Sequence, residues 1–301
     1  PQGGDLGRMS ALDAGYDVRS SGVTLDRYCG SGITGVSLAA ATIASGMAEL
    51  VVAGGTEMMS MPGRRSAGDK PPVMDSGNLR LRARHPQSHQ GVCADAIATL
   101  EGISREDVDH LALSSQQRAA RAIANGYFKK SLIPVYREDG SLALDHEEFP
   151  RPQTTLEGLS ALKPSFEAVA DVAVDDEGTT YRSLILQKYP DLKIQFIHHP
   201  GNSSGVVDGS AALLLASPEY AKAHGLKPRA RVVATANMGD SPTLLLKAPV
   251  PAAKKVLAKA GLNLEDIDLF EINEAFAVVA EKLIRDLALD RDKVNVNGGA
   301  M

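Results

Sequence analysis

Apolar positions near the N-terminus change from a short continuous run to helical spacing and back. Residues 22–25 form a short, β-branched apolar run, which predicts a strand. Residues 33–47 are rich in Ala and repeat apolar side chains at helical spacing, so they predict a helix. A second apolar run at 49–53 stops at Gly54-Gly55 and predicts another strand. This strand–helix–strand order implies a parallel sheet with covered faces.

The middle of the chain has weaker periodicity and reads as an insertion or cap. Residues 58–90 are rich in Met, Pro, Gly and Arg, and residues 139–191 are polar and Pro-containing, so both are predicted to be largely irregular. Ser104 is a predicted N-cap, and Asn125-Gly126 ends the helix that it starts. The other elements predicted here are helices at 91–100 and 157–162 and a strand at 132–136.

Short apolar runs and helical spacing alternate again after residue 208. Strands are predicted at 209–216, 231–236, 268–272 and 294–296, and helices at 251–260 and 274–287. The strand–turn–helix–strand pattern of the first segment therefore recurs near the end. It recurs as a pattern and not as a sequence, which indicates two similar α/β halves.

Composition and charge exclude several classes of protein. The chain has 301 residues, of which 44% are hydrophobic and 23% charged, as is ordinary for a globular protein. A net charge of -5 argues against a nucleic-acid binder. No apolar run approaches a membrane span, and no signal peptide is visible. The two cysteines, Cys29 and Cys93, show no metal-ligand spacing and no disulfide framework, so a cytoplasmic protein without a metal is expected.

Cys29 is the strongest candidate for chemistry. It is expected in the first turn of a helix, where free backbone N–H groups and the helix dipole favour the nucleophilic thiolate. Glycines follow it at positions 30 and 32, so a substrate can approach the backbone closely, and the N–H groups can hold an oxyanion. The alternative is that Cys29 is a small core residue, as most cysteines of soluble proteins are.

Two further segments carry polar residues at turns. Asn273, in Asn273-Glu274-Ala275-Phe276-Ala277, can hold a water or polarise a carbonyl, or it can be a plain N-cap. The segment 201–205, with the sequence Gly-Asn-Ser-Ser-Gly, can touch a ligand or be an ordinary loop before a strand. Taken singly, each segment fits the structural alternative at least as well.

Five segments in order resemble the signature motifs of the thiolase family. Residues 26–32 resemble its nucleophile motif, and residues 52–60 resemble the strand end and glycine turn that follow. Residues 201–209 resemble the segment on the coenzyme A side. Residues 273–277 and 295–300 match two further signatures. The resemblance covers essentially the whole chain.

The resemblance implies an α/β fold of five layers, α-β-α-β-α, built from two similar halves with an inserted loop domain. The implied boundaries are 1–58 for the first part of the N-terminal half, 59–205 for the loop domain, 206–225 for the last strand of that half, and 226–301 for an incomplete C-terminal half. Homodimers or homotetramers are typical of the family.

The resemblance also implies acyl transfer between coenzyme A thioesters, with acyl-CoA and CoA as the ligands and no metal or redox cofactor. Cys29 corresponds to the nucleophile that accepts the acyl group, and its own N–H to one oxyanion donor. Asn273 corresponds to the residue that holds a catalytic water in the other oxyanion hole. Substrate or CoA contacts are implied for His89, Ser204, Gly205 and Phe276.

Thiolases carry a catalytic His and a second catalytic Cys further along the chain, whereas this sequence stops at Met301. Both ends therefore look cut, and negligible thiolase turnover is expected of the 301-residue chain. Cys93 lies in the wrong motif to be the second cysteine and is expected in a buried helix position. His198 and His199, adjacent on an extended segment, are expected to face opposite ways as structural or surface residues.

Two other functions remain open at this point. One is a ketoacyl synthase that acts on carrier-protein thioesters, although such enzymes resemble this chain less at 273–277, where they place a His. The other is a non-catalytic, thiolase-like lipid carrier or interaction protein, against which the retention of Cys29 and Asn273 argues.

Overall fold

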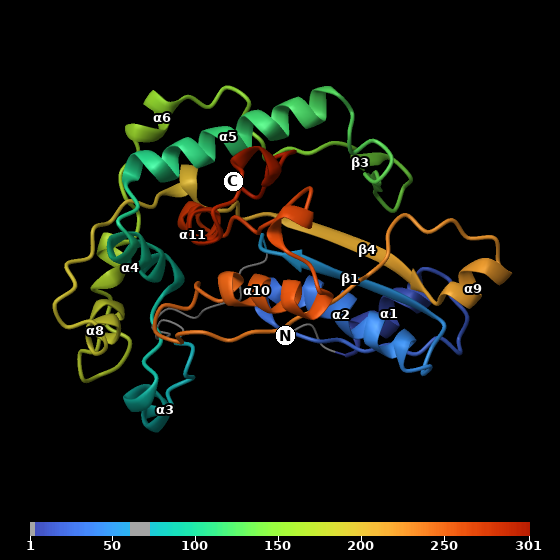
Figure 1. The fold of residues 1–301 in the computed structure, drawn as a ribbon, viewed down its shortest axis with the longest axis horizontal. Helices are drawn as coiled ribbons and strands as arrows, with labels where there is room; N and C mark the ends of the chain where they lie inside the picture. Colours follow the sequence, from blue (N-terminus) through green and yellow to red (C-terminus); the bar gives the residue numbers. More distant parts are fainter. Residues whose placement is uncertain (1–3, 61–72) are drawn as a thin grey trace. The chain divides into compact units, whose positions relative to one another are not determined.

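The computed structural model describes residues 4–60 and 73–301. The chain folds as two compact units. The described parts of 1–62 and 207–235 form the first unit, and the described parts of 63–206 and 236–301 form the second. Figure 1 shows their elements as a ribbon. None of the helices in the described part of the chain is long and apolar enough to cross a membrane.

The first unit is built around a two-stranded antiparallel sheet. Strand β1 (Leu50–Met58) pairs with β4 (Asp208–Ala216), in a register that sets Leu50 opposite Ala216. Helix α2 (Ser31–Ala44) packs against β1. The predicted helix at 33–47 and the predicted strands at 49–53 and 209–216 are therefore confirmed. The remaining helices of the unit are α1 (Leu6–Asp13), the 3₁₀ turn η1 (Tyr28–Gly30) and α9 (Pro218–Ala223).

The predicted strand at 22–25 and the parallel pairing it implied are wrong. This segment is irregular, and Thr24 instead joins the start of α1 by donating its hydroxyl to Asp5 Oδ1 at 2.7 Å and accepting the Gly7 N–H at 3.1 Å. A strand needs a neighbour to satisfy its backbone groups, and β1 finds that neighbour in β4, about 150 residues later, with the opposite direction. Residues 231–236, also predicted as a strand, are irregular.

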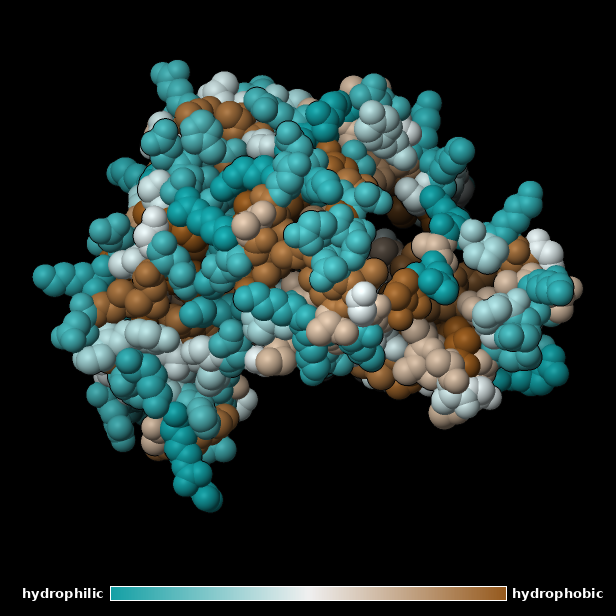
Figure 2. Space-filling view, viewed as in Figure 1, coloured by the Kyte–Doolittle hydropathy of each residue, from teal (hydrophilic) through white to brown (hydrophobic). Residues whose placement is uncertain are grey.

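Apolar side chains of the first unit lie largely on its surface. Its buried apolar residues are three alanines, Ala39, Ala53 and Ala221, whereas Leu213 and Leu214 of β4 are about 60% exposed. Brown, hydrophobic atoms accordingly appear at the surface over this sheet in Figure 2. The described part of the first unit therefore has little buried apolar core of its own.

The second unit is largely helical and contains the main core. Helix α11 (Ala277–Leu287) packs against both α4 (Gln90–Glu101) and α5 (Arg105–Ala124). Residues with almost no exposure, such as Val92, Ile97, Val108 and Val278, fill the space between them. The other helices and turns are α3 (Leu79–Arg84), α6 (Leu156–Ser160), α7 (Glu167–Ala170), α8 (Tyr181–Leu186), η2 (Pro200–Asn202), α10 (Pro249–Ala260), η3 (Leu264–Asp266) and η4 (Arg291–Lys293).

The helix ends predicted at Ser104 and Gly261 are confirmed. The Ser104 hydroxyl accepts the Asp107 N–H, and the Asp107 side chain binds the Ser104 N–H, so α5 begins with a complete capping box. Helix α10 ends at Gly261, whose φ of +67° is the left-handed value expected at that position. The helices predicted at 91–100 and 157–162 are α4 and α6.

Strands predicted in this unit are shorter than expected. The strand at 132–136 is reduced to β2 (Val135–Tyr136), which pairs with β3 (Leu142–Leu144) inside a region predicted to be irregular. The strands at 268–272 and 294–296 are reduced to one parallel bridge between Phe270 and Val294. The helix predicted to start at 274 starts at Ala277, because Phe276 is extended and pairs with Ser203.

Candidate active site

Cys29 lies on a sharp turn of the first unit that directly precedes a helix, whereas the sequence predicted it in the first turn of that helix. It occupies the 3₁₀ turn η1, while α2 begins at Ser31 with Gly30 as its N-cap. The preceding Tyr28 has a φ of +51°, a left-handed value that costs a residue with a side chain about 1 kcal/mol or more. Hydrogen bonds hold this conformation: Asp26 Oδ1 accepts the Tyr28 N–H at 2.8 Å, and the Ser31 hydroxyl donates to the Tyr28 carbonyl at 2.6 Å.

The turn leaves the Cys29 thiol exposed. The alternative that Cys29 is a buried core residue is therefore wrong. Among the residues that the structure describes, none accepts a hydrogen bond from the Cys29 N–H. The exposed thiol can attack a carbonyl carbon, and the backbone N–H at the positive end of α2 can bind the carbonyl oxygen that becomes negative.

Asn273 belongs to the second unit and is exposed. It is not an N-cap, because α11 begins four residues later and Phe276 occupies the cap position. The residue before it is fixed from both sides: Asn295 Oδ1 accepts the Ile272 N–H at 2.8 Å, and Asn295 Nδ2 donates to the Ile272 carbonyl at 2.9 Å. Within the described residues the Asn273 carboxamide has no hydrogen-bond partner, so a rigid backbone presents a free amide group.

Glu274 shows why two of the sequence motifs lie together. Its buried carboxylate accepts hydrogen bonds from the Ser115 hydroxyl and from Asn295 Nδ2, both at 2.7 Å. A Cβ at Gly299 would lie 2.1 Å from the Glu274 carboxyl carbon, so only glycine fits there. The segments 273–277 and 295–300 are therefore packed against each other through one carboxylate.

The residues Gly201-Asn202-Ser203-Ser204-Gly205, which we call the 201–205 turn, bind the same two segments. The Ser204 N–H donates to the Ala275 carbonyl at 3.1 Å, and the Gly205 N–H donates to the Ala300 carbonyl at 3.0 Å. A Cβ at Gly205 would lie 2.4 Å from the Phe149 ring. The second unit thus brings together three motifs that are far apart in the sequence, namely the 201–205 turn, 273–277 and 295–300.

His89 and Phe276 are joined through aromatic contacts. The centroid of the His89 ring lies 5.4 Å from that of Tyr181 and 5.7 Å from that of Phe166. The ring centroids of Phe166 and Phe276 are 5.7 Å apart in an edge-to-face contact. Burial lowers the pKa of His89, which keeps the ring neutral near pH 7. Its Nδ1 accepts the Gly91 N–H at 3.1 Å and so caps α4.

Cys93 has the structural place that the sequence predicted. It is fully buried in α4, with its sulfur 3.3 Å from the Thr243 carbonyl oxygen. Burial raises the pKa of the Cys93 thiol to about 12, so the group is un-ionised at neutral pH. Of the two cysteines, Cys29 alone is exposed.

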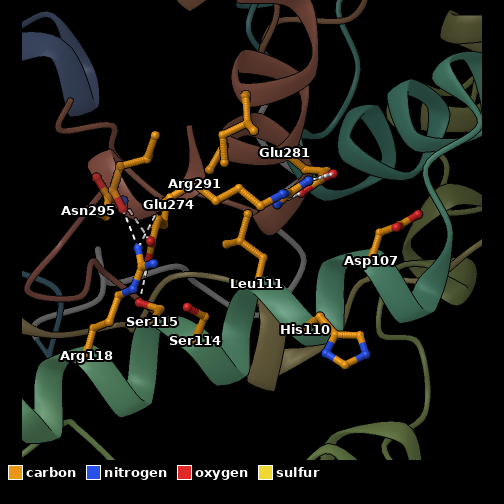
Figure 3. Close-up of a pocket in the computed structure, with 13 residues that line it drawn as sticks. Asp107, His110, Leu111, Ser114, Ser115, Arg118, Glu274, Glu281, Arg291 and Asn295 are labelled. Carbon is orange, nitrogen blue, oxygen red and sulfur yellow. Dashed lines mark hydrogen bonds and ion pairs between the residues drawn. The ribbon is translucent and has the colours of Figure 1, made fainter. Parts of the chain in front are cut away.

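Sequence reasoning did not identify a cavity of about 360 Å³ beside α5 and α11 (Figure 3). The charged groups of its wall bind partners within the protein. Arg291 donates to both oxygens of Glu281, and Arg118 donates to the Val294 carbonyl. These charged groups of the cavity wall are thus already paired within the protein, unlike the exposed groups of Cys29 and Asn273 in the described part of the chain. Its lining residues are Asp107, His110, Leu111, Ser114, Ser115, Arg118, Glu274, Ala280, Glu281, Ile284, Arg291, Val294 and Asn295.

Comparison with known proteins agrees with this geometry. Residues 2–180 match the family model "Thiolase, N-terminal domain", and residues 226–301 match "Thiolase, C-terminal domain". A beta-ketoadipyl-CoA thiolase of Acinetobacter baylyi is 38% identical, over 99% of this chain and 72% of its own length. An acetyl-CoA acetyltransferase of Chromobacterium violaceum is 37% identical, over 98% of this chain and 71% of its own length.

Solved structures give the same result. The human mitochondrial 3-ketoacyl-CoA thiolase matches with a TM-score of 0.77 and 35% identity, over 98% of this chain and 71% of that chain, and it has also been solved in complex with CoA. These matches confirm the predicted thiolase-like α/β fold and favour a thiolase over a ketoacyl synthase. The chain belongs to the thiolase family and is an acyltransferase of the thiolase type.

Proposed function

We propose that the protein forms or cleaves 3-ketoacyl-CoA through an acyl-enzyme on Cys29. The observation that carries the proposal is the exposed Cys29 thiol on a held turn, next to a backbone N–H with no partner among the described residues. The thiolase family membership of the chain supplies the reaction class. Acyl-CoA and CoA are then the ligands.

The first half-reaction follows from the chemistry of the thiol. The Cys29 sulfur attacks the thioester carbonyl carbon, a sulfur–carbon bond forms, and the carbonyl oxygen becomes an oxyanion. The Cys29 N–H stabilises this oxyanion. When the oxyanion collapses, the bond to the CoA sulfur breaks, and CoA leaves with the proton that the Cys29 thiol gave up. The acyl group is thereby stored as a thioester on the protein.

We assign Asn273 to a second oxyanion site, where its free carboxamide holds a water that donates to the substrate oxygen. The support is its exposure and the fixed backbone of Ile272, the residue before it. Ser204 and Gly205 are assigned to CoA, and His89 and Phe276 to the apolar arm that links the nucleotide to the sulfur. The neutral, half-buried His89 ring suits contact with an uncharged amide-containing chain.

The remaining expectations from the family resemblance are part of the same proposal. The protein works without a metal or redox cofactor, because the thiol itself breaks the thioester. It forms a homodimer or homotetramer and works in the cytoplasm. It acts on neither nucleic acid nor membrane, which its net charge of -5 supports for nucleic acid.

Peptide mapping after exposure to acetyl-CoA tests the central step. The protein is incubated with acetyl-CoA, quenched in acid and digested, and the peptides that contain Cys29 and Cys93 are compared by mass spectrometry. The proposal predicts an acetyl group on the Cys29 peptide and its loss in Cys29→Ala, while Cys93→Ala serves as the matched control that retains it. An unacetylated Cys29 in a folded protein whose Cys29 reacts with iodoacetamide would contradict the proposal.

A further inference from the structure

Two adjacent histidines of the second unit are completely buried and bind different helices. His198 Nδ1 lies 2.7 Å from Asp95 Oδ1 on α4, and His199 Nε2 lies 2.9 Å from Asp109 Oδ1 on α5. The sequence predicted that they face opposite ways as structural or surface residues. The opposite orientation and the structural role are confirmed, whereas the surface alternative is wrong because both residues are fully buried. The segment that carries them is thus anchored between α4 and α5, directly before the 201–205 turn.

The hydrogen bonds of His199 fix its tautomer. Its Nδ1 accepts the Gly201 N–H at 3.0 Å, so this nitrogen carries no proton. Its Nε2 therefore carries the proton and donates it to Asp109 Oδ1. One side of the ring holds the first residue of the 201–205 turn, and the other side is fixed to α5.

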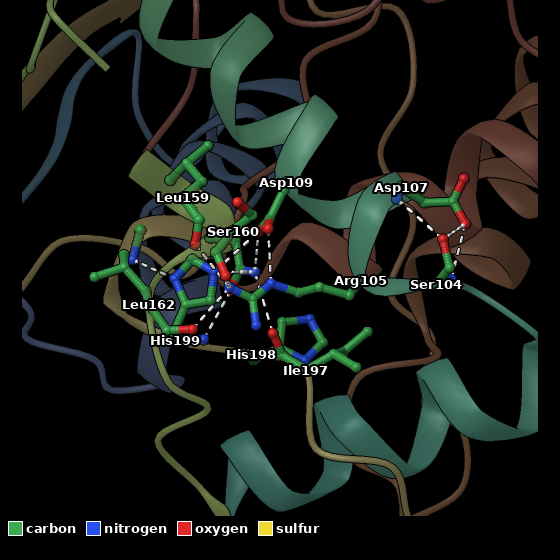
Figure 4. Close-up of polar contacts among 12 residues, drawn as sticks. Ser104, Arg105, Asp107, Asp109, Leu159, Ser160, Leu162, Ile197, His198 and His199 are labelled. Atoms are coloured by element: carbon green, nitrogen blue, oxygen red, sulfur yellow. Dashed lines mark hydrogen bonds and ion pairs between the residues drawn. The ribbon is translucent and has the colours of Figure 1, made fainter. Parts of the chain in front are cut away.

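Asp109 is a strong anchor because it binds three groups at once (Figure 4). In addition to His199, Asn202 Nδ2 donates to its Oδ1 at 2.8 Å and Arg105 Nε donates to its Oδ2 at 2.7 Å. Burial favours the neutral acid, but the hydrogen bonds from His199, Arg105 and Asn202 outweigh it and lower the pKa of Asp109. The carboxylate therefore stays ionised and keeps the proton of His199 on Nε2.

The same network reaches two further parts of the unit. Arg105 Nη2 donates to the carbonyls of Leu159 at 2.7 Å and Leu162 at 2.9 Å, at the end of α6. The Asn202 side-chain oxygen accepts the His199 N–H at 2.8 Å, which closes a second bond around the start of the turn. A Cβ at Gly201 would meet Leu159 at 2.6 Å, so the turn is packed as well as bonded here.

His199 and Asn202 supply the side-chain restraints on the 201–205 turn. The next side chain, Ser203, is buried, but its hydroxyl has no hydrogen-bond partner among the described residues. Beyond it, the turn uses backbone bonds from Ser204 and Gly205 to Ala275 and Ala300. The turn is thus held at its start by bonds to the His199 and Asn202 side chains and at its end by backbone bonds to Ala275 and Ala300.

We propose that His199 is a positioning residue for the substrate thioester, which sets the 201–205 turn through its bond to the Gly201 N–H. The inference rests on the proposed function, because it takes Ser204 and Gly205 as contacts of the CoA portion. According to this inference, substrate binding depends on the hydrogen-bond acceptor at Nδ1 of His199, and not simply on a buried ring at this position.

Two substitutions test the roles of Nδ1 and Nε2 of the His199 ring separately. In His199→Asn, the amide oxygen can replace Nδ1 as acceptor for the Gly201 N–H, because asparagine is a good cap at this kind of turn. In His199→Gln, the amide nitrogen can reach Asp109 in place of Nε2, but the acceptor beside the Gly201 N–H is lost. Arg82→Met is the matched control, because it removes a buried ion pair with Asp75 in the same unit, away from the turn.

The measured quantity is the rate of Cys29 acetylation as a function of acetyl-CoA concentration. We expect His199→Gln to raise the half-saturating concentration about tenfold, the effect of one lost hydrogen bond in a buried site, with a smaller change in maximal rate. His199→Asn and Arg82→Met are expected to keep the wild-type half-saturating concentration. Iodoacetamide labelling of Cys29, which needs no CoA, is expected to be equal in all four proteins.

The outcomes are distinguishable from failure of the proposed function. If the wild-type protein does not acetylate Cys29, the proposed function itself fails. If it does, and His199→Gln saturates like the wild type, the inference about His199 is overturned. It is also overturned if His199→Asn is impaired more than His199→Gln, because the bond to Asp109 would then be the one that matters. Circular dichroism at the assay temperature verifies that each variant is folded.

Discussion

The two cysteines should differ in reactivity by several orders of magnitude. Reaction with a disulfide reagent requires the thiolate, and burial raises the pKa of Cys93 to about 12. At pH 8 the thiolate fraction of Cys93 is therefore about one in ten thousand. Cys93 has no exposed surface, so it must also wait for local opening, whereas Cys29 is exposed in the native turn.

The assay counts reactive thiols with a chromogenic disulfide reagent at pH 8, first in native buffer and then in guanidinium. We expect one fast thiol in the native protein and a second only after unfolding. Cys29→Ala should remove the fast phase, and Cys93→Ala should leave it unchanged. Two thiols of equal native rate, or a fast phase that survives in Cys29→Ala, would refute the assignment of Cys29 as the accessible nucleophile.

Three further substitutions have defined expected effects. Gly205→Ala places a Cβ 2.4 Å from the Phe149 ring and should lower the free energy of unfolding by about 1–3 kcal/mol, as measured by denaturant titration. Asn273→Ala should leave that free energy within about 0.5 kcal/mol of wild type, because the side chain is exposed. For Glu281, burial is outweighed by the bonds from Arg291 and Arg285, so its pKa is lowered. Its stabilising contribution is full above the unfolded-state value of 4.5 and is lost as pH falls through the lower folded-state pKa, so thermal melts of Glu281→Gln should depend less on pH below 4.5 than those of the wild type.

Features that depend on neighbouring residues in the sequence were predictable. Ser104 and Asp107 form the capping box that their spacing indicates, and Gly261 ends α10 because a left-handed residue is needed there. The thiolase resemblance was likewise carried by local motifs, each a few residues long. The position of Cys29 was predicted to within one turn, whereas the left-handed conformation of the preceding Tyr28 has no clear signal in the sequence.

Features that depend on distant partners were not predictable. The run at 22–25 has the composition of a strand, but β1 pairs with β4, so the run binds α1 instead. Asn273 is a residue type that favours an N-cap. However, Phe276 is extended and pairs with Ser203, so α11 begins only at Ala277. The Asp109 carboxylate that holds His199 lies 90 residues away, and only the fold brings the two together.

Exchange of labelled CoA into acetyl-CoA tests the central claim most directly. If the acyl group is stored on Cys29, the first half-reaction is reversible, and the protein alone should move label from free CoA into acetyl-CoA. The account predicts exchange in the wild-type protein and in Cys93→Ala, and its loss in Cys29→Ala. Exchange that persists in Cys29→Ala, or that is absent from wild-type protein with a reactive Cys29, would contradict it.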